Sequence, residues 1–457
     1  MSNPERRLLL AGFFAASHNV THFHGGWRHP EASHDFFSAE YYQNVARTLE
    51  RGLFDLLFIP DAQAVEDRYG DSLEAGVGLG AQGATFLDPV TVLSLLVGET
   101  TKIGLGVTIS TTYSQPFALA RTLASLDQLS GGRAAWNIVT SLNASEARNY
   151  GLASHLDHDT RYDRADEFVA VADGLWHSWQ PDALVLDRAG GVFADTSKVG
   201  YLDHQGEWFN VRGPLSVPRT PQGRPVIIQA GTSPRGRRFA ARWADLVFVI
   251  APNRFALKAI YDDVKTKVVE AGRDPDAVRV IEAIIPIVGE TEAEARDKEQ
   301  FLVSLVDPRA GLSTLSSHFD VDFSRFDLDA PVESVLSQIE SVGGARGLFE
   351  LVVESTQTSG GTLADLGAAY GWVLVERFTG TAEQIAAAIA DYFTEPITDG
   401  FAISPAVLPA TYEEFVDQVV PILQDKGVFH TRYEDGATLR DRLALPYVPA
   451  ADPVSII

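Results

Sequence analysis

The 457-residue sequence contains no cysteine, and this absence excludes several kinds of chemistry. Disulfides, thiolate nucleophiles, iron–sulfur clusters and cysteine-type zinc sites all need that residue. No apolar run approaches the ~20 residues of a membrane-spanning helix, so we expect no membrane partner. Basic residues are also scarce, because 37 Lys and Arg stand against 61 Asp and Glu and give a net charge of −24. A surface of that sign repels nucleic acid, which we therefore exclude as a partner.

The remaining composition is that of an ordinary globular protein, with 45% apolar and 21% charged residues. The first 17 residues resemble a short signal peptide, because two arginines precede a run of nine apolar residues. No small-residue cleavage site closes this run, so we interpret it as a polar arm followed by a first buried strand. The sequence then predicts a large, acidic, cytoplasmic enzyme.

Short apolar runs alternate with longer amphipathic segments along the chain. Eight such runs are typical of buried strands: Leu8–Phe14, Phe54–Pro60, Ile103–Ser110, Ala135–Thr140, Val226–Ala230, Leu246–Ile250, Val278–Val288 and Phe401–Ala406. Apolar strands separated by helices predict a parallel sheet buried on both faces, either open and doubly wound or closed as a (β/α)₈ barrel. Eight repeats favour the closed TIM barrel, because closure leaves no sheet edge.

An ideal barrel takes about 250 residues, so roughly 200 residues of this chain must lie in insertions. We expect the insertions near residues 61–88, 142–159, 182–224 and 307–380, where the sequence is Gly-rich, polar or suited to a hairpin. The chain shows no internal repeat and no low-complexity linker. We therefore predict one elaborated domain over residues 1–457.

Two local patterns have competing interpretations. Gly78–Gly83 matches the dinucleotide fingerprint GxGxxG, but no strand precedes it, so we interpret it as a loop. The segment His18–His29 holds four histidines in twelve residues, and imidazoles at such spacing can bind a metal. The segment contains no carboxylate and follows the first strand. We therefore favour a loop at the barrel mouth that supplies hydrogen-bonding or acid–base groups, with no metal.

Polar side chains follow the second, third, fourth and fifth predicted strands. Asp61 follows the second strand, Thr108 lies near the end of the third, and Asn137 and Thr140 lie at the end of the fourth. The fifth strand leads through Ser233 into a helix, whose free N–H groups suit a phosphate. Because active sites of such barrels lie at the carboxyl ends of the strands, we expect a site for a large polar ligand carrying phosphate.

Several long motifs resemble the flavin-dependent monooxygenases of the bacterial luciferase-like family. The resemblance covers essentially the whole chain, and its longest blocks are WNIVTSLNASEARNYG at Trp136–Gly151, HDTRYDRADEF at His158–Phe168 and QAGTSPRGRRFAARWADLVF at Gln229–Phe248. Shorter blocks are GGWRHP, FDLLFIPD, GVTISTTY and DGFAISPAVLP. The similarity is to the branch of nitrilotriacetate, EDTA, long-chain alkane and dibenzothiophene sulfone monooxygenases, and within it most to the last group.

The resemblance implies a (β/α)₈ barrel, reduced FMN (FMNH₂) as cofactor, and O₂ as co-substrate. It also implies a separate NAD(P)H-dependent flavin reductase that delivers FMNH₂ by diffusion, and a homodimer or homotetramer. Matching motif by motif, the residues expected to contact FMN are Asp61, Thr108, His158, Tyr162 and Ser233, with Asn137 and Thr140 as second contacts. His158 and Tyr162 have an alternative role as a helix-start cap.

Two histidines match positions that the family uses near the substrate. We expect His22 and His318 to hydrogen bond the substrate's oxygen atoms, and one of them to donate a proton, because imidazole titrates near neutral pH. Phe14, Phe58, Phe248 and Ile250 lie at strand ends and predict an apolar, aromatic substrate pocket. The alternative is that some of these four side chains belong to the barrel core.

The predicted reaction is oxidative cleavage of the C–S bond of dibenzothiophene sulfone or a close aromatic sulfone, giving a hydroxybiphenyl sulfinate. An aminopolycarboxylate would require several Arg or Lys at the strand ends, and these show none. A flexible alkane would not require histidines directed at a sulfone. The alternatives are a family member acting on such another substrate, a non-catalytic flavin-binding protein, and a metal-dependent barrel hydrolase that uses the His18–His29 segment.

Overall fold

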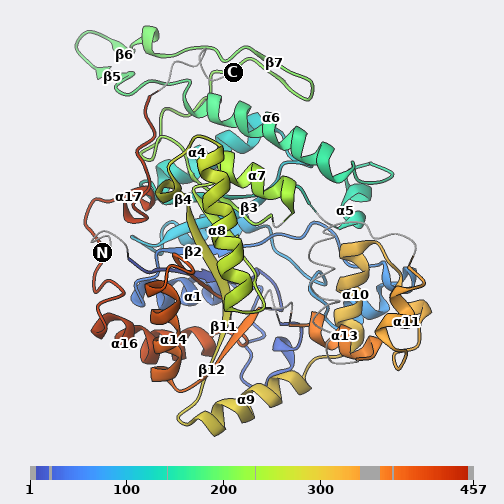
Figure 1. Cartoon of the computed structure of the whole chain (residues 1–457). Helices are drawn as coiled ribbons and strands as arrows, with labels where there is room; N and C mark the ends of the chain where they lie inside the picture. Colours follow the sequence, from blue (N-terminus) through green and yellow to red (C-terminus); the bar gives the residue numbers. More distant parts are fainter. Residues whose placement is uncertain are drawn as a thin grey trace.

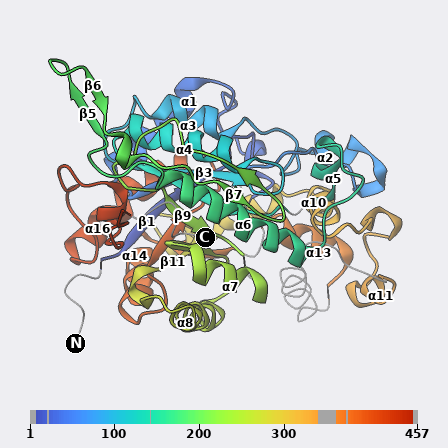
Figure 2. The same ribbon diagram turned by 90° about the horizontal axis from the view of Figure 1, so that it is seen from above.

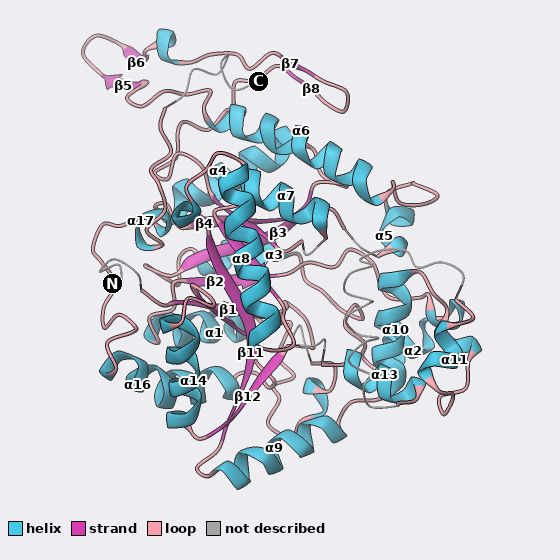
Figure 3. Ribbon diagram, in the orientation of Figure 1, coloured by secondary structure: helices cyan, strands magenta, loops and turns pink. Residues whose placement is uncertain are grey.

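The computed structural model describes residues 7–19, 23–141, 143–231, 233–339, 361–372 and 375–450. Eight parallel strands pair side by side, and pairing of β10 with β11 closes them into a barrel (Figure 3). The barrel strands are β1 (Leu9–Phe13), β2 (Leu56–Ile59), β3 (Gly104–Ser110), β4 (Ala134–Val139), β9 (Val226–Gln229), β10 (Leu246–Val249), β11 (Arg279–Val288) and β13 (Gly400–Ile403). All eight coincide with the predicted strands, so the predicted (β/α)₈ barrel is confirmed.

Helices cover the outside of the barrel (Figure 1). Each strand is followed by at least one helix, and the apolar faces of these helices pack against the strands in one hydrophobic cluster. Polar side chains set several helix starts: Ser38, Asp88 and Asp157 each accept a hydrogen bond from a backbone N–H of the following helix. The surrounding helices are α1 (Ala39–Arg51), α3 (Pro89–Leu96), α4 (Pro116–Ser130), α6 (His158–Trp176), α7 (Pro234–Trp243), α8 (Arg254–Glu270), α14 (Ala382–Thr394), α15 (Ala410–Glu414) and α16 (Val420–Asp425), joined near the C-terminus by α17 (Leu439–Arg442).

A ninth parallel strand, β12 (Glu376–Gly380), lies outside the barrel. It pairs with the second half of β11, from Ile284 to Val288, after the pairing of β11 with β10 has ended at Glu282. The sequence analysis did not predict this strand, because ERFTG is mostly polar and carries no apolar run. The extra length of β11 provides its partner.

Helices from separate insertions gather beside the carboxyl ends of the strands (Figure 2). They are α2 (Leu73–Gly78), α5 (Ala144–Asn149), α10 (Pro308–Phe319), α11 (Val332–Leu336) and α13 (Leu363–Tyr370), with α9 (Glu292–Ser304) leading into α10. Gly78 ends α2, and the remaining residues of the GxGxxG match form turns, so the loop interpretation of that pattern is confirmed.

The predicted hairpin region, residues 182–224, contains two antiparallel pairs. These are β5 (Leu184–Asp187) with β6 (Val192–Ala194), and β7 (His204–Gln205) with β8 (Asn210–Val211). They extend beyond α6, at the top of Figure 1. Short 3₁₀ turns occur at Gly26–Arg28, Tyr69–Asp71, Thr196–Lys198, Pro275–Ala277 and Phe323–Arg325, and a π-helical turn at Phe415–Val419.

The described residues form two separate hydrophobic clusters. The larger one fills the barrel and the layer between the strands and their helices. The smaller one belongs to the insertion around α10, α11 and α13, and its buried members include Leu312, Phe319, Leu366 and Tyr370. This insertion therefore supplies most of its own core. No helix among the described residues has the length and apolarity to cross a bilayer.

Candidate functional site at the barrel mouth

An aromatic trio marks the interior of the barrel near its carboxyl end. Phe13, Phe58 and Phe248 come from three strands, and the ring of Phe13 lies 4.6 Å from that of Phe58 and 4.7 Å from that of Phe248. Phe58 and Phe248 were predicted as pocket residues, whereas Phe13 was not. Because side chains alternate along a strand, the neighbouring Phe14 points the other way.

The prediction that Phe14 lines the pocket is corrected by its contacts. Its ring packs against Tyr42 of α1 and Tyr412 of α15, in the layer between the barrel and its helices. The fourth predicted pocket residue, Ile250, follows β10 and is a partly buried side chain packed on the main core. The inner aromatic surface is therefore formed by Phe13, Phe58 and Phe248.

Two buried polar side chains share this interior face. Thr108 and Asn137 are register partners on β3 and β4, and Nδ2 of Asn137 donates to Oγ1 of Thr108 over 3.0 Å. Strand alternation places Thr108 on the side of Gly106, which is itself the register partner of Phe58. Oδ1 of Asn137 is buried and has no hydrogen-bond partner among the described residues. A buried unpaired acceptor is costly, so it calls for a donor from a ligand or a water molecule.

Two further predicted residues lie just beyond the same strand ends. Asp61 is partly buried two residues after β2, and its Oδ2 accepts from Nε2 of Gln63 at 2.8 Å. Burial raises the pKa of Asp61 to about 6, and the nearby charge of Asp88 adds to the rise. Thr140 follows β4 and is buried, and its backbone carbonyl accepts from the hydroxyl of Thr112.

A polar cradle forms where β9 leads into α7. Ser233 is the N-cap of α7, and its Oγ accepts from the backbone N–H of Gly236 at 3.0 Å and lies 3.2 Å from Nε2 of His158. Tyr162 lies one turn after His158 on α6, and burial raises the pKa of its hydroxyl. The structure thus brings together the three predicted residues His158, Tyr162 and Ser233.

The backbone of this cradle leaves no space for an additional side chain. A Cβ atom on Gly231 would lie 2.5 Å from the hydroxyl of Tyr162 and 2.4 Å from Nε2 of Gln229. Oε1 of Gln229 is buried without a hydrogen-bond partner among the described residues. The positive end of the α7 helix dipole, a serine hydroxyl and a tyrosine hydroxyl suit a phosphate group. These observations fit the phosphate end of a flavin nucleotide.

The two predicted histidines have different outcomes. His22 lies outside the described residues. His318 lies near the end of α10, partly buried, with Nδ1 2.7 Å from the hydroxyl of Tyr370 on α13. Burial lowers the pKa of His318 to about 4, so its imidazole is neutral at physiological pH.

Three residues near His318 were missed by the sequence analysis as site residues. His24 is 2% exposed, and burial together with the nearby His318 lowers its pKa to about 3, while a hydrogen bond with Gln82 acts in the opposite direction. Glu66 is also buried, and its Oε2 accepts from Oγ1 of Thr314 at 2.8 Å. The third is Tyr370. The four-histidine segment pointed to His24, whereas no local pattern marks Glu66 or Tyr370.

The histidine segment does not form a metal centre in the part of the chain that is described. No group of three or more His, Asp or Glu side chains is arranged there to hold a metal ion. Instead, His18 bonds to Oγ1 of Thr85 at 2.7 Å and to the carbonyl of Gly80. His29 lies elsewhere, with Nδ1 accepting from the backbone N–H of Glu31 at 3.2 Å.

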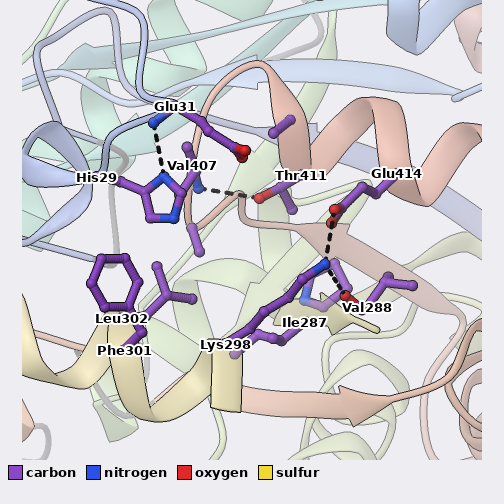
Figure 4. Close-up of a pocket in the computed structure, with 13 residues that line it drawn as sticks. His29, Glu31, Ile287, Val288, Lys298, Phe301, Leu302, Val407, Thr411 and Glu414 are labelled. Carbon is purple, nitrogen blue, oxygen red and sulfur yellow. Dashed lines mark hydrogen bonds and ion pairs between the residues drawn. The ribbon is translucent and has the colours of Figure 1, made fainter. Parts of the chain in front are cut away.

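His29 lines a separate cavity of about 240 Å³ outside the predicted site (Figure 4). Figure 4 shows Lys298 of α9 reaching across this cavity to Glu414 of α15, at 3.3 Å. Lys298 also donates to the carbonyl of Val288 at 2.9 Å. Of the predicted flavin and substrate residues that the structure describes, none lines this cavity.

Comparisons with known proteins identify the family of this barrel. Residues 16–399 match the family model described as luciferase-like monooxygenase. The chain is 54% identical to a dibenzothiophene-sulfone monooxygenase of Rhodococcus erythropolis (strain XP), over 96% of this chain and 97% of that protein. It is 39% identical to nitrilotriacetate monooxygenase component A of Aminobacter aminovorans, over 92% and 93% of the two chains.

A solved structure of similar shape is riboflavin lyase with modified FMN and riboflavin. It superposes with a TM-score of 0.88 at 30% identity and covers 99% of each chain. The family model spans most of the sequence, and the curated relatives are matched over nearly their full length. The chain belongs to the luciferase-like monooxygenase family.

Proposed function

We propose that this protein is the oxygenase of a two-component system that uses FMNH₂ and O₂ to cleave the C–S bond of dibenzothiophene sulfone or a close aromatic sulfone. The product is a hydroxybiphenyl sulfinate. The observation that carries this proposal is the 54% identity to a dibenzothiophene-sulfone monooxygenase over 96% of the chain. The clustered rings of Phe13, Phe58 and Phe248 support it, because a flat neutral substrate packs well on aromatic side chains.

The flavin would be held by residues from four barrel strands, β2, β3, β4 and β9, and the segments that follow them. Tyr162 and Ser233 donate to its phosphate beside the start of α7, with His158 completing the cradle. Thr108, Asn137, Thr140 and Asp61 lie at the strand ends where the polar edge of the isoalloxazine requires partners. The unpaired Oδ1 of Asn137 accepts from a ring N–H in this arrangement.

When bound, reduced FMN supplies the electrons that activate O₂ for insertion of one oxygen atom. The protein's own residues provide the surroundings for that step. The aromatic trio excludes water and orients the substrate's rings. His318 hydrogen bonds a substrate oxygen, and His22 is proposed for the same role. Because His318 is neutral at physiological pH, it acts as a hydrogen-bond donor, and we assign proton donation at the reacting end of the substrate to His22.

The partner is a separate NAD(P)H-dependent reductase that releases FMNH₂ for capture by this protein. The relative named component A of nitrilotriacetate monooxygenase supports a division of the reaction between two proteins. We place both proteins in the cytoplasm, where NAD(P)H is available. The whole chain is proposed to act as one domain, because Thr314 of the α10 insertion bonds Glu66 in the loop after β2.

We also propose that the protein forms a homodimer or homotetramer. A surface groove of about 640 Å³ runs between α3 and α4. The exposed apolar side chains Leu95, Phe117 and Leu129 lie on these two helices. Such side chains on adjacent helices are typical of a subunit interface. Light scattering of the purified protein tests this proposal, and a monomer at micromolar concentration would contradict it.

The proposed reaction is tested with chemically reduced FMN, so that no reductase is needed. Purified protein is mixed with O₂ and, separately, dibenzothiophene sulfone, a long-chain alkane and nitrilotriacetate, and the products are identified by mass spectrometry. We expect a hydroxybiphenyl sulfinate from the sulfone alone. Turnover of either other compound with the sulfone untouched would refute the proposed substrate. Loss of activity on metal chelation would favour the hydrolase alternative.

A further inference from the structure

Tyr370 forms the only hydrogen bond that His318 makes among the described residues. Its hydroxyl lies 2.7 Å from Nδ1 of His318, and the Tyr370 side chain is fully buried. Burial raises the pKa of Tyr370 well above its ordinary value, so the phenol keeps its proton at any physiological pH. A neutral phenol therefore faces a neutral imidazole.

The packing of α10 against α13 fixes this pair. A Cβ on Gly311 would lie 1.9 Å from the carbonyl oxygen of Gly367, so the two helix backbones approach more closely than any side chain would allow. The ring of Phe319 meets that of Tyr370 edge-on, with centroids 6.1 Å apart. On the same helix as His318, Thr314 donates to the buried Glu66. These contacts fix the positions of both partners, because Phe319 packs against Tyr370 and the bond from Thr314 to Glu66 anchors the helix that carries His318.

The proton positions in this pair follow from what each atom can bond. The hydroxyl of Tyr370 has no other partner among the described residues, so if Nδ1 of His318 carried the proton, the phenolic proton would be buried without an acceptor. An unsatisfied buried donor is costly, whereas donation from the phenol to Nδ1 satisfies both groups. The neutral imidazole must then carry its own proton on Nε2.

The protonated Nε2 is available to a ligand. It has no hydrogen-bond partner among the described residues, and His318 is only partly buried. Its neighbour His24 is buried, and burial keeps that second imidazole neutral as well. A fixed N–H at this position suits a group that only accepts hydrogen bonds. A sulfone oxygen is such a group, whereas an unoxidised thioether sulfur is a weak acceptor.

We propose that Tyr370 is a positioning residue that locks His318 as a permanent Nε2–H donor and thereby selects a substrate carrying acceptor-only oxygens over its unoxidised sulfide. The inference rests on the proposed function for the identity of the ligand. It goes beyond that function by assigning the source of the selectivity to a residue whose hydroxyl bonds only the histidine among the described residues.

The first experiment is nitrogen NMR of the wild-type protein labelled with ¹⁵N-histidine. The His318 signals are identified by their loss in a His318→Asn variant. We expect Nε2 at a protonated, pyrrole-type shift and Nδ1 at an unprotonated, hydrogen-bonded shift between pH 6 and 8. A protonated Nδ1 would overturn the inference. No substrate is needed, so this result stands or fails independently of the proposed reaction.

The second experiment compares Tyr370→Phe with Tyr392→Phe. Tyr392 is also a buried tyrosine with a hydrogen-bonded hydroxyl, donated to Glu376 at 2.8 Å, but it lies on α14 away from the mouth. In Tyr370→Phe we expect sulfone binding to weaken by about 5- to 20-fold, while binding of dibenzothiophene, which lacks the oxygens, stays unchanged. Tyr392→Phe should change neither affinity.

Each outcome of the comparison decides one question. Equal weakening for the sulfone and the sulfide in Tyr370→Phe would mean general damage to the pocket and would overturn the selectivity role. If the NMR shows the Nε2 proton but the sulfone is never turned over, the proposed function fails while the locked tautomer stands. A Tyr370→Phe protein that does not fold leaves the wild-type NMR result as the deciding measurement.

Discussion

Replacing Ser233 by alanine tests whether the start of α7 holds the flavin phosphate. The substitution removes the acceptor for the backbone N–H of Gly236 at 3.0 Å and the partner of His158 at 3.2 Å. Loss of an N-cap hydroxyl costs about 1 kcal/mol of folding stability. If Ser233 also donates to a phosphate, loss of that charge-assisted bond costs about a further 1.5–3 kcal/mol of binding, which is about a 10- to 150-fold weaker affinity for FMN.

The control is Thr291→Ala. Thr291 caps α9 by accepting from the backbone N–H of Glu294 at 3.2 Å, but it is not one of the residues proposed to bind flavin. Both variants should lose a similar amount of stability in urea unfolding. FMN affinity, measured by quenching of flavin fluorescence, should fall only in Ser233→Ala. Wild-type affinity in Ser233→Ala, or an equal loss in both variants, would refute the assignment of the phosphate site.

Three further predictions concern the rings, an acid and a buried ion pair. Phe248→Leu should raise the KM for the sulfone, because Phe248 belongs to the inner aromatic trio. Phe14→Leu should lower only the urea midpoint of unfolding, because Phe14 packs on the outer helices, and a changed KM in this variant would contradict the assignment. The folded-state pKa of Asp61, about 6, means that ionisation of this carboxyl destabilises the folded wild type as the pH rises from 4 to 7.5. Asp61→Asn lacks this loss, so its free energy of unfolding should rise relative to that of the wild type by on the order of 1–3 kcal/mol over the same range. A difference that does not vary with pH would refute this prediction. Arg440→Ala should lower the free energy of unfolding in urea by about 3 kcal/mol, because it removes the cation 2.8 Å from the buried carboxylate of Asp245. Arg51→Ala, which breaks an exposed ion pair, should lower it by almost nothing, and equal losses in the two variants would contradict the prediction.

The barrel was predictable because its strands are short apolar runs separated by helices with clear caps. The face that each residue presents was less predictable. Leu8–Phe14 is apolar throughout, so the sequence contains no alternation that tells Phe13 from Phe14, and a shift of one residue exchanges the inner face for the outer. β12 was missed for the opposite reason, because its polar sequence gains a strand partner only from the extra length of β11.

The resemblance to a family supplied most of the candidate site, including the cradle of His158, Tyr162 and Ser233. It did not supply the residues that hydrogen bond to the candidate site residues or to the helix that carries them. Tyr370 lies 52 residues from His318 in the sequence, and Thr314 lies 248 residues from Glu66. Such pairs arise from the packing of separate insertions, which no local spacing or periodicity encodes.

The separate hydrophobic cluster beneath α10, α11 and α13 has a consequence for how this architecture diversifies. His318, the side chain that we propose to meet the substrate, lies on an insertion with a hydrophobic core of its own, whereas the proposed phosphate cradle lies where a barrel strand leads into α7. Mutations in the insertion can therefore accumulate without weakening the hold on the nucleotide. Enzymes that act on different sulfur, carbon or nitrogen compounds can then arise by changes in this insertion while the barrel stays the same.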